Sequence, residues 1–203
     1  MTSPQKPDSV YRRFSGKGVF PYQMAFTLLI PLRNIYLSPG ILIKRLELKS
    51  NHTVLEIGPG PGYFSVEVAR YLSQGTLFLF DIQQQMLDMA QRRLEKRGLS
   101  NVQYYLADRE NFPFADRQFD RVFMVTVLGE VENKEVYVRE ITRTLKDNGM
   151  VSVSELAGDP DKMKPEEIIA LFETAGLTCC RHYRKLGGYT LSFTKQAFPS
   201  NGH

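Results

Sequence analysis

The chain has 203 residues, of which 42% are hydrophobic and 24% are charged, and its formal net charge is +4 at pH 7. A chain of this length suits one mixed α/β domain, which buries roughly 70% of its unfolded surface. The composition excludes global disorder.

The N-terminal 45 residues combine a basic arm with an apolar segment. Residues 19–43 contain Arg33 as their only charged residue, but the uninterrupted apolar piece ends near Pro31. It is therefore shorter than the ~20 residues that a membrane-spanning helix needs. We expect one or two short helices broken at prolines, preceded by an arm whose basic residues are Lys6, Arg12, Arg13 and Lys17.

Strand-like and helix-like patterns alternate from residue 53 onward. Runs of β-branched and aliphatic residues predict strands at 53–57, 76–80, 102–106, 119–125 and 150–155. Apolar residues at helical spacing predict the intervening helices, with Gly98, Asn148-Gly149 and Gly176 as their ends. This alternation is typical of a parallel sheet with right-handed crossovers.

The C-terminal part reads differently. Residues 177–184 and 188–195, joined at Leu186-Gly187, predict a hairpin that adds an antiparallel edge strand. The expected fold is α/β, a doubly wound, mostly parallel seven-stranded sheet with an antiparallel C-terminal hairpin and an N-terminal helical cover. Its domain spans residues 46–195, and residues 196–203 form a frayed tail.

The two cysteines, Cys179 and Cys180, are adjacent, so their side chains should point to opposite faces of a strand. A local disulfide is not expected, and no Cys/His spacing suggests a metal site. The first residues do not lead into the apolar core of a secretion signal. These observations together favour a reducing, cytoplasmic location.

A glycine-rich turn follows the first strand, and a helix leaves it. Glycines at positions 58, 60 and 62 let the backbone approach a ligand closely. The spacing differs from the GxGxxG dinucleotide fingerprint, and no Gly-Lys-Ser/Thr of a Walker A loop follows. Glu56, two places before the first glycine, would repel a pyrophosphate and suit a cationic amino group. The motif therefore favours a ligand with an ammonium group.

From residue 46 to residue 195 the chain resembles the class I S-adenosylmethionine-dependent methyltransferases. The glycine turn resembles their first motif, and Asp81 matches the acidic residue that accepts both ribose hydroxyls. Ile82 matches the apolar residue against adenine, and Asp108, before Arg109, matches the residue that accepts from the adenine amino group. Other positions where the resemblance implies cofactor contact are Pro59, Tyr63, Phe64, Met86, Val125 and Thr126.

Methyl transfer needs a general base only if the acceptor loses a proton. The resemblance places two candidates at the carboxyl edge of the sheet, Glu130 and Glu155, which could instead cap helices or bind water. The histidines are scattered, and none is expected at this edge.

The sequence after the fourth strand bears on the acceptor. Amino-methyltransferases of DNA bases carry an Asn/Asp-Pro-Pro-aromatic tetrapeptide there, whereas this chain has Val125-Thr126-Val127-Leu128. The sequence has neither the tetrapeptide nor a basic stripe interleaved with aromatic residues, so a nucleic-acid substrate is not expected. The subgroup most similar to the chain is the small-molecule enzymes related to ubiquinone/menaquinone-biosynthesis C-methyltransferases.

The function expected from these features is methyl transfer from S-adenosylmethionine to a small, apolar acceptor. A nonenzymatic S-adenosylmethionine-binding sensor or scaffold is the alternative, and an NAD-dependent oxidoreductase is disfavoured by the glycine spacing and Glu56. Residues 19–43 would close the acceptor pocket as a lid. Ordinary packing against the core, or peripheral contact with a membrane surface, are alternatives for this segment.

Overall fold

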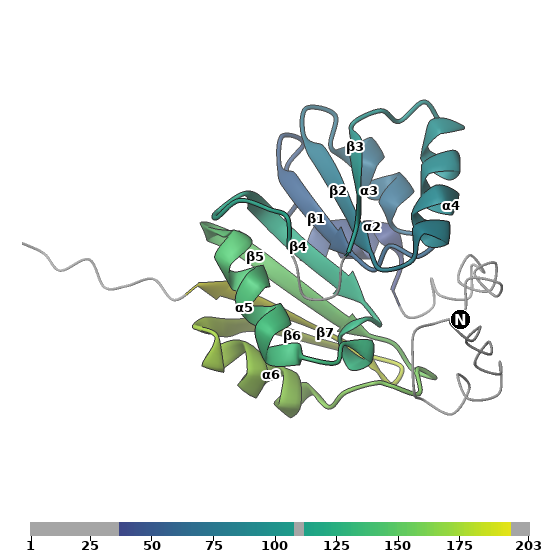
Figure 1. Ribbon diagram of the computed structural model, residues 1–203. Helices are drawn as coiled ribbons and strands as arrows, with labels where there is room; N and C mark the ends of the chain where they lie inside the picture. Colours follow the sequence, from purple (N-terminus) through teal and green to yellow (C-terminus); the bar gives the residue numbers. More distant parts are fainter. Residues whose placement is uncertain (1–36, 108–111, 196–203) are drawn as a thin grey trace, which may run out of the picture.

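The computed structural model describes residues 37–107 and 112–195 (Figure 1). The basic arm, most of the expected lid and the C-terminal tail lie outside these residues, as do Asp108 and Arg109. Of the apolar segment at 19–43, only its end is described, where Ser38 caps the short helix α2 (Pro39–Arg45) by accepting from the amide of Ile41 at 3.3 Å. Pro39, one of the prolines at which a break is predicted, is thus the first residue of a helix.

Seven strands form the sheet, and helices connect most of them. The strands are β1 (Thr53–Ile57), β2 (Thr76–Asp81), β3 (Val102–Leu106), β4 (Phe119–Val125), β5 (Leu145–Glu155), β6 (Leu177–Lys185) and β7 (Gly188–Lys195). The helices that follow α2 are α3 (Ser65–Tyr71), α4 (Gln84–Glu95), the 3-10 turn η3 (Leu128–Glu130), α5 (Lys134–Thr144) and α6 (Pro165–Thr174).

The strand order is β3-β2-β1-β4-β5-β7-β6, with β1 to β5 parallel. The predicted seven-stranded, mostly parallel sheet with a C-terminal hairpin is confirmed. The order reverses between β1 and β4, and this switch point is where open α/β sheets bind ligands, outside the carboxyl ends of the strands.

The hairpin closes the sheet with an edge strand, β6, that is antiparallel to its neighbour β7, as predicted. β7 lies between β5 and β6 and is antiparallel to both. The burial patterns explain this placement. The first six residues of β7 are all buried, whereas β6 alternates with exposed residues, as an edge strand with one wetted face does.

The boundary between α5 and β5 also differs from the prediction, which ended the helix at Asn148-Gly149 and began the strand at residue 150. The helix ends at Thr144, and β5 already begins at Leu145, which pairs with Phe119 of β4. The register then shifts before Met150 pairs with Arg121. Asn148-Gly149 therefore marks an irregularity within the strand rather than a helix end.

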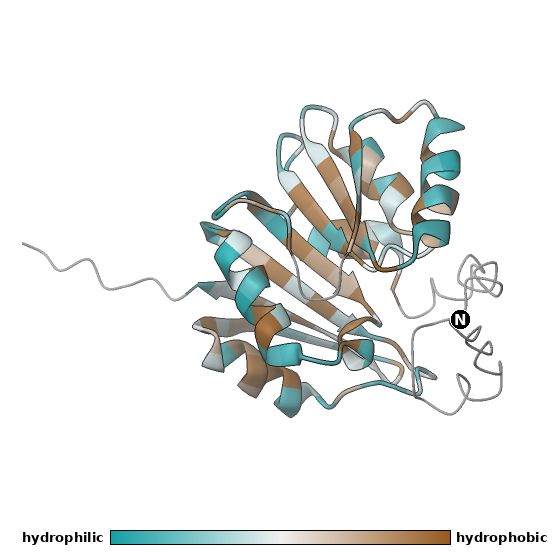
Figure 2. Ribbon diagram, in the orientation of Figure 1, coloured by the Kyte–Doolittle hydropathy of each residue, from teal (hydrophilic) through white to brown (hydrophobic). Residues whose placement is uncertain are grey.

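The sheet separates two apolar cores, and its strands are mostly hydrophobic in Figure 2. One face packs against α5 and α6 through residues such as Ile141 and Phe172. The other packs against α2, α3 and α4 through residues such as Leu42, Val68 and Leu87. This three-layer arrangement leaves the carboxyl ends of the parallel strands at one edge.

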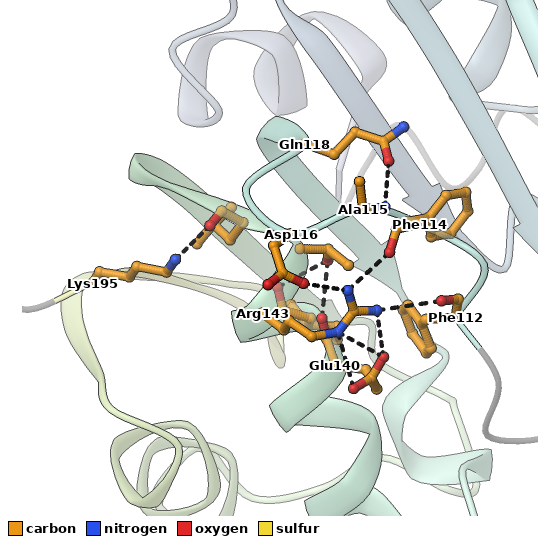
Figure 3. A network of polar contacts seen from close by, with 11 residues as sticks. Phe112, Phe114, Ala115, Asp116, Gln118, Glu140, Arg143 and Lys195 are labelled. Atoms are coloured by element: carbon orange, nitrogen blue, oxygen red, sulfur yellow. Dashed lines mark hydrogen bonds and ion pairs between the residues drawn. The ribbon is translucent and has the colours of Figure 1, made fainter.

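No helix forms at residues 112–118, between β3 and β4. An aromatic segment covers the sheet there instead. The ring of Phe114 lies against those of Phe80, Tyr105 and Phe119, with centroids 5.0 to 5.4 Å apart. Figure 3 shows how Arg143 of α5 holds the segment. Its guanidinium donates to the carbonyl of Phe114 at 2.9 Å and to the carboxylate of Asp116 at 2.7 Å.

Candidate functional site

The glycine turn lies at the switch point, between the end of β1 and the start of α3. Gly58, Gly60 and Gly62 all have positive φ values, 63°, 53° and 81°. A side chain would also crowd its neighbours at two of them, because a Cβ on Gly58 would overlap Val127 and one on Gly62 would lie 3.1 Å from Ala90. Both the backbone conformation and the close packing therefore favour glycine.

Asp81 ends β2 beside this turn and is 8% exposed. Its carboxylate accepts from the amide of Gly60 at 3.3 Å and from the amide of Gln83 at 2.9 Å. Burial raises the pKa of Asp81 to about 6, against the effect of these backbone hydrogen bonds. Asp81 is not the N-cap residue of α4, because that position is Gln83. The Asp81 carboxylate instead links the glycine turn to the end of β2.

Glu56 of β1 is 2% exposed, and its Oε2 has no hydrogen-bond partner among the described residues. Burial raises the pKa of Glu56 to about 8, with the Ser65 side chain opposing the shift and the neighbouring Asp81 carboxylate adding to it. A buried carboxylate without a cation is costly in its charged form. A ligand ammonium group is the kind of partner that would offset this cost.

The other residues predicted to contact a cofactor differ in how exposed they are to solvent. Phe64, Met86 and Val125 are buried in the protein, while Ile82 is 50% exposed. Pro59 is buried within the turn and accepts from the amide of Gly62 at 3.1 Å. Tyr63 is half-buried at the start of α3. The turn, Asp81 and the end of β4 thus meet at one edge of the sheet.

Thr126, directly after β4, has a left-handed backbone with φ of 56°. This conformation is unusual for a β-branched residue and costs of order 1–3 kcal/mol. Its amide donates to the carbonyl of Ser154 at 2.8 Å, which fixes the turn on β5. The next residue, Val127, packs on Gly58. No local sequence pattern pointed to Val127, because the contact joins two separate turns.

Glu155 ends β5 and is completely buried. Neither carboxylate oxygen has a partner with hydrogen-bond geometry among the described residues. Burial raises the pKa of Glu155 to about 8, and the carboxylates of Asp159 and Glu130 add to this shift while Lys162 opposes it. The second candidate base, Glu130, belongs to η3 and is half-buried. The two candidates therefore lie in one electrostatic cluster.

The raised pKa of Glu155 makes the stability of the fold depend on pH. Its pKa is about 8 in the folded protein and 4.5 ordinarily, so the folded state binds the proton more tightly. The stabilisation is fully present below pH 4.5 and is lost as pH rises toward 8, at up to about 1.4 kcal/mol per pH unit. Glu56 has the same direction of shift.

We therefore expect Glu155→Gln to flatten this decline. Urea unfolding between pH 5 and pH 8.5 should show the variant gaining about 2–4 kcal/mol relative to the wild type across that range. Exposed Glu173 provides the control, because Glu173→Gln should leave the slope unchanged. If the free energy of unfolding fell with pH equally in Glu155→Gln and the wild type, the raised pKa of Glu155 would be contradicted.

Within residues 37–107 and 112–195, no three His, Cys, Asp or Glu side chains gather in a way that could hold a metal ion. The helices in the same part of the chain are too short or too polar to cross a membrane. Cys179 and Cys180 are both free thiols.

Comparison with known proteins gives three findings. Residues 48–183 match the family described as "Methyltransferase domain". The ubiquinone/menaquinone biosynthesis C-methyltransferase UbiE of Pseudomonas entomophila (strain L48) is 33% identical over 141 residues, which are 65% of this chain and 55% of that protein. The chain therefore spans about half the length of the curated relatives it matches.

Two solved structures share the fold. A S-adenosylmethionine-dependent methyltransferase from Aquifex aeolicus superposes with a TM-score of 0.80 at 22% identity, over 86% of this chain and 98% of that chain. The [4+2]-cyclase SpnF superposes with a TM-score of 0.71 at 18% identity, over 79% and 80% of the two chains. Proteins with more than one activity thus share this fold.

Proposed function

Because this chain belongs to the class I S-adenosylmethionine-dependent methyltransferases, we propose that it transfers a methyl group from that cofactor to a small-molecule acceptor. The observation that carries the proposal is the pairing of a glycine turn with two buried carboxylates, Glu56 and Asp81, at the switch point of the sheet.

The residues at this point suit each part of the cofactor. Glu56 Oε2, which has no partner among the described residues, would face the ammonium group. The turn at Gly58 and Gly60 gives the backbone access to the methionine part. Asp81 would accept the ribose hydroxyls, and the exposed Ile82 would lie against adenine. Asp108 and Arg109, on the adenine side in the same proposal, belong to the part of the chain left undescribed.

Bound S-adenosylmethionine supplies an electrophilic methyl group on its sulfonium. The protein's part is to align the acceptor with that group and to exclude water. We propose Glu155 over Glu130 as the proton acceptor, where the acceptor requires one. Glu155 is buried at the end of β5, and burial holds its pKa near the working pH of a general base.

The small-molecule class of acceptor is supported by the likeness to UbiE, whose name places it in ubiquinone and menaquinone biosynthesis. The apolar character of the acceptor remains a proposal that rests on residues 19–43, of which 19–36 lie outside the described part.

Asp81→Ala tests the cofactor site. Loss of a charge-assisted hydrogen bond to ribose should weaken S-adenosylhomocysteine binding by about 1–3 kcal/mol. Calorimetric titration measures this directly. Asp88→Ala is the matched control, since Asp88 lies on α4 and accepts from Gln84 one turn away. Equal affinities for Asp81→Ala and the wild type would remove Asp81 from the site.

A further inference from the structure

An arginine continues a helical face that is otherwise buried, and a second arginine follows the helix. Met86 and Ala90 of α4 are buried, and Ala90 lies against Gly62 at the start of α3. Arg93 follows at position i+3 from Ala90, and therefore on the same face of the helix, and Arg97 comes two residues after the helix ends at Glu95. Apolar residues are expected where this face meets the neighbouring helix. A local departure from that rule is a reason to look for a function.

A cavity of about 360 Å³ lies at these arginines. Its size falls in the range of small-molecule sites. The residues that line it come from the start of α2, from the beginning of α3 and the turn before it, and from the last turn of α4 and the turn after it: Pro39, Gly40, Tyr63, Val66, Glu67, Arg93 and Arg97.

The charge of this cavity is not balanced by the described residues. The Nε of Arg93 is buried and has no hydrogen-bond partner among them, and no described carboxylate forms an ion pair with Arg93. Burial lowers the pKa of Arg93, and the nearby Arg97 lowers it further. The Glu67 carboxylate in the cavity wall accepts from Arg70 at 2.5 and 2.7 Å through its two oxygens.

The ordinary role of basic residues in the last turn of a helix does not explain Arg93. Such residues interact with the C-terminal end of the helix dipole from an exposed position. Arg92 has that exposure, and it does not line the cavity. Arg97 makes the usual contact, because its Nη1 donates to the carbonyl of Arg93 at 2.9 Å. Arg93 instead directs a planar, permanently charged group with five donors to a cavity wall.

We propose that this cavity binds a phosphate group, with Arg93 as its principal ligand and Arg97 as the second cation. A guanidinium pairs with phosphate oxygens through two parallel hydrogen bonds, which would satisfy the buried Nε. The phosphate belongs either to a free small molecule or to a lipid headgroup. Tyr63 follows directly on the glycine turn, so an occupant of the cavity would lie one residue from the cofactor loop.

The test uses the full chain and inorganic phosphate, titrated calorimetrically at constant ionic strength. The wild type should bind saturably, and Arg93→Gln and Arg97→Gln should each weaken binding at least about tenfold, whereas Arg92→Gln should stay within about twofold. S-adenosylhomocysteine should bind to all four proteins alike. This second titration distinguishes a failure of the phosphate site from a failure of the proposed methyl transfer, because only the latter requires cofactor binding.

Sedimentation with phosphatidic acid vesicles distinguishes the two sources of the phosphate. Binding to these vesicles that Arg93→Gln abolishes indicates a headgroup, and binding of inorganic phosphate without vesicle binding indicates a free molecule. If Arg93→Gln does not fold, Arg93→Lys keeps the charge, loses the planar fork and should still bind more weakly. The proposal is overturned if neither probe binds up to about 20 mM phosphate, or if the Arg93 variant binds as the wild type does.

Discussion

Gly60→Val is expected to abolish S-adenosylhomocysteine binding while the domain stays folded. Gly60 has φ of 53°, and its amide donates to Asp81, so it joins the two halves of the proposed site. A β-branched side chain disfavours this backbone and would stand where the cofactor approaches. Calorimetric titration should show a loss of more than about 100-fold in affinity, or about 3 kcal/mol.

Gly98 provides a matched control for this substitution. It has a similar φ of 66° at the end of α4, and nothing lies within 4 Å of where its Cβ would be. Gly98→Val should therefore carry the backbone strain and lower stability without changing the affinity. If Gly60→Val bound S-adenosylhomocysteine with wild-type affinity, the glycine turn would not be the cofactor site.

The second large effect is expected on stability, from Phe114→Ala. Phe114 is 5% exposed, and its ring lies against several others in the segment that covers the sheet between β3 and β4. Removing it leaves a cavity that the neighbouring rings cannot fill. The free energy of unfolding in urea should fall by about 3–5 kcal/mol.

Leu106→Ala is the control for this loss, because Leu106 is about half exposed at the end of the neighbouring strand β3. It should change the free energy of unfolding by less than about 1 kcal/mol. A Phe114→Ala variant as stable as the Leu106 variant would show that the aromatic segment does not hold the sheet.

The strands were the most predictable part of the fold. The bounds of β1, β3 and β4 are the predicted ones, because β-branched, aliphatic and aromatic residues are concentrated in each of them. The start of β5 was missed because it depends on the pairing of Leu145 with Phe119, which lies 26 positions earlier. An Asn-Gly pair reads as a helix end locally, although here it lies inside the strand.

The candidate site likewise has residues that the local sequence predicts and contacts that it does not. Its glycines, Glu56 and Asp81 could be predicted, since each stands at the end of a recognisable strand. The packing of Val127 on Gly58, and the hold of Arg143 on the aromatic segment, join residues from separate connections. The pattern of α4 likewise placed Arg93 on a helix without indicating the cavity beside it. Such contacts follow from the assembled fold.

The central claim about function is that the switch point takes S-adenosylmethionine rather than a nicotinamide cofactor. Calorimetric titration of the full chain with S-adenosylhomocysteine, repeated in the presence of excess NADH, tests it most directly. Glu56 beside the glycine turn should favour the ligand with an ammonium group and disfavour the pyrophosphate. We expect saturable binding of S-adenosylhomocysteine that NADH leaves unchanged. Binding of NADH, with no binding of S-adenosylhomocysteine, would contradict the account.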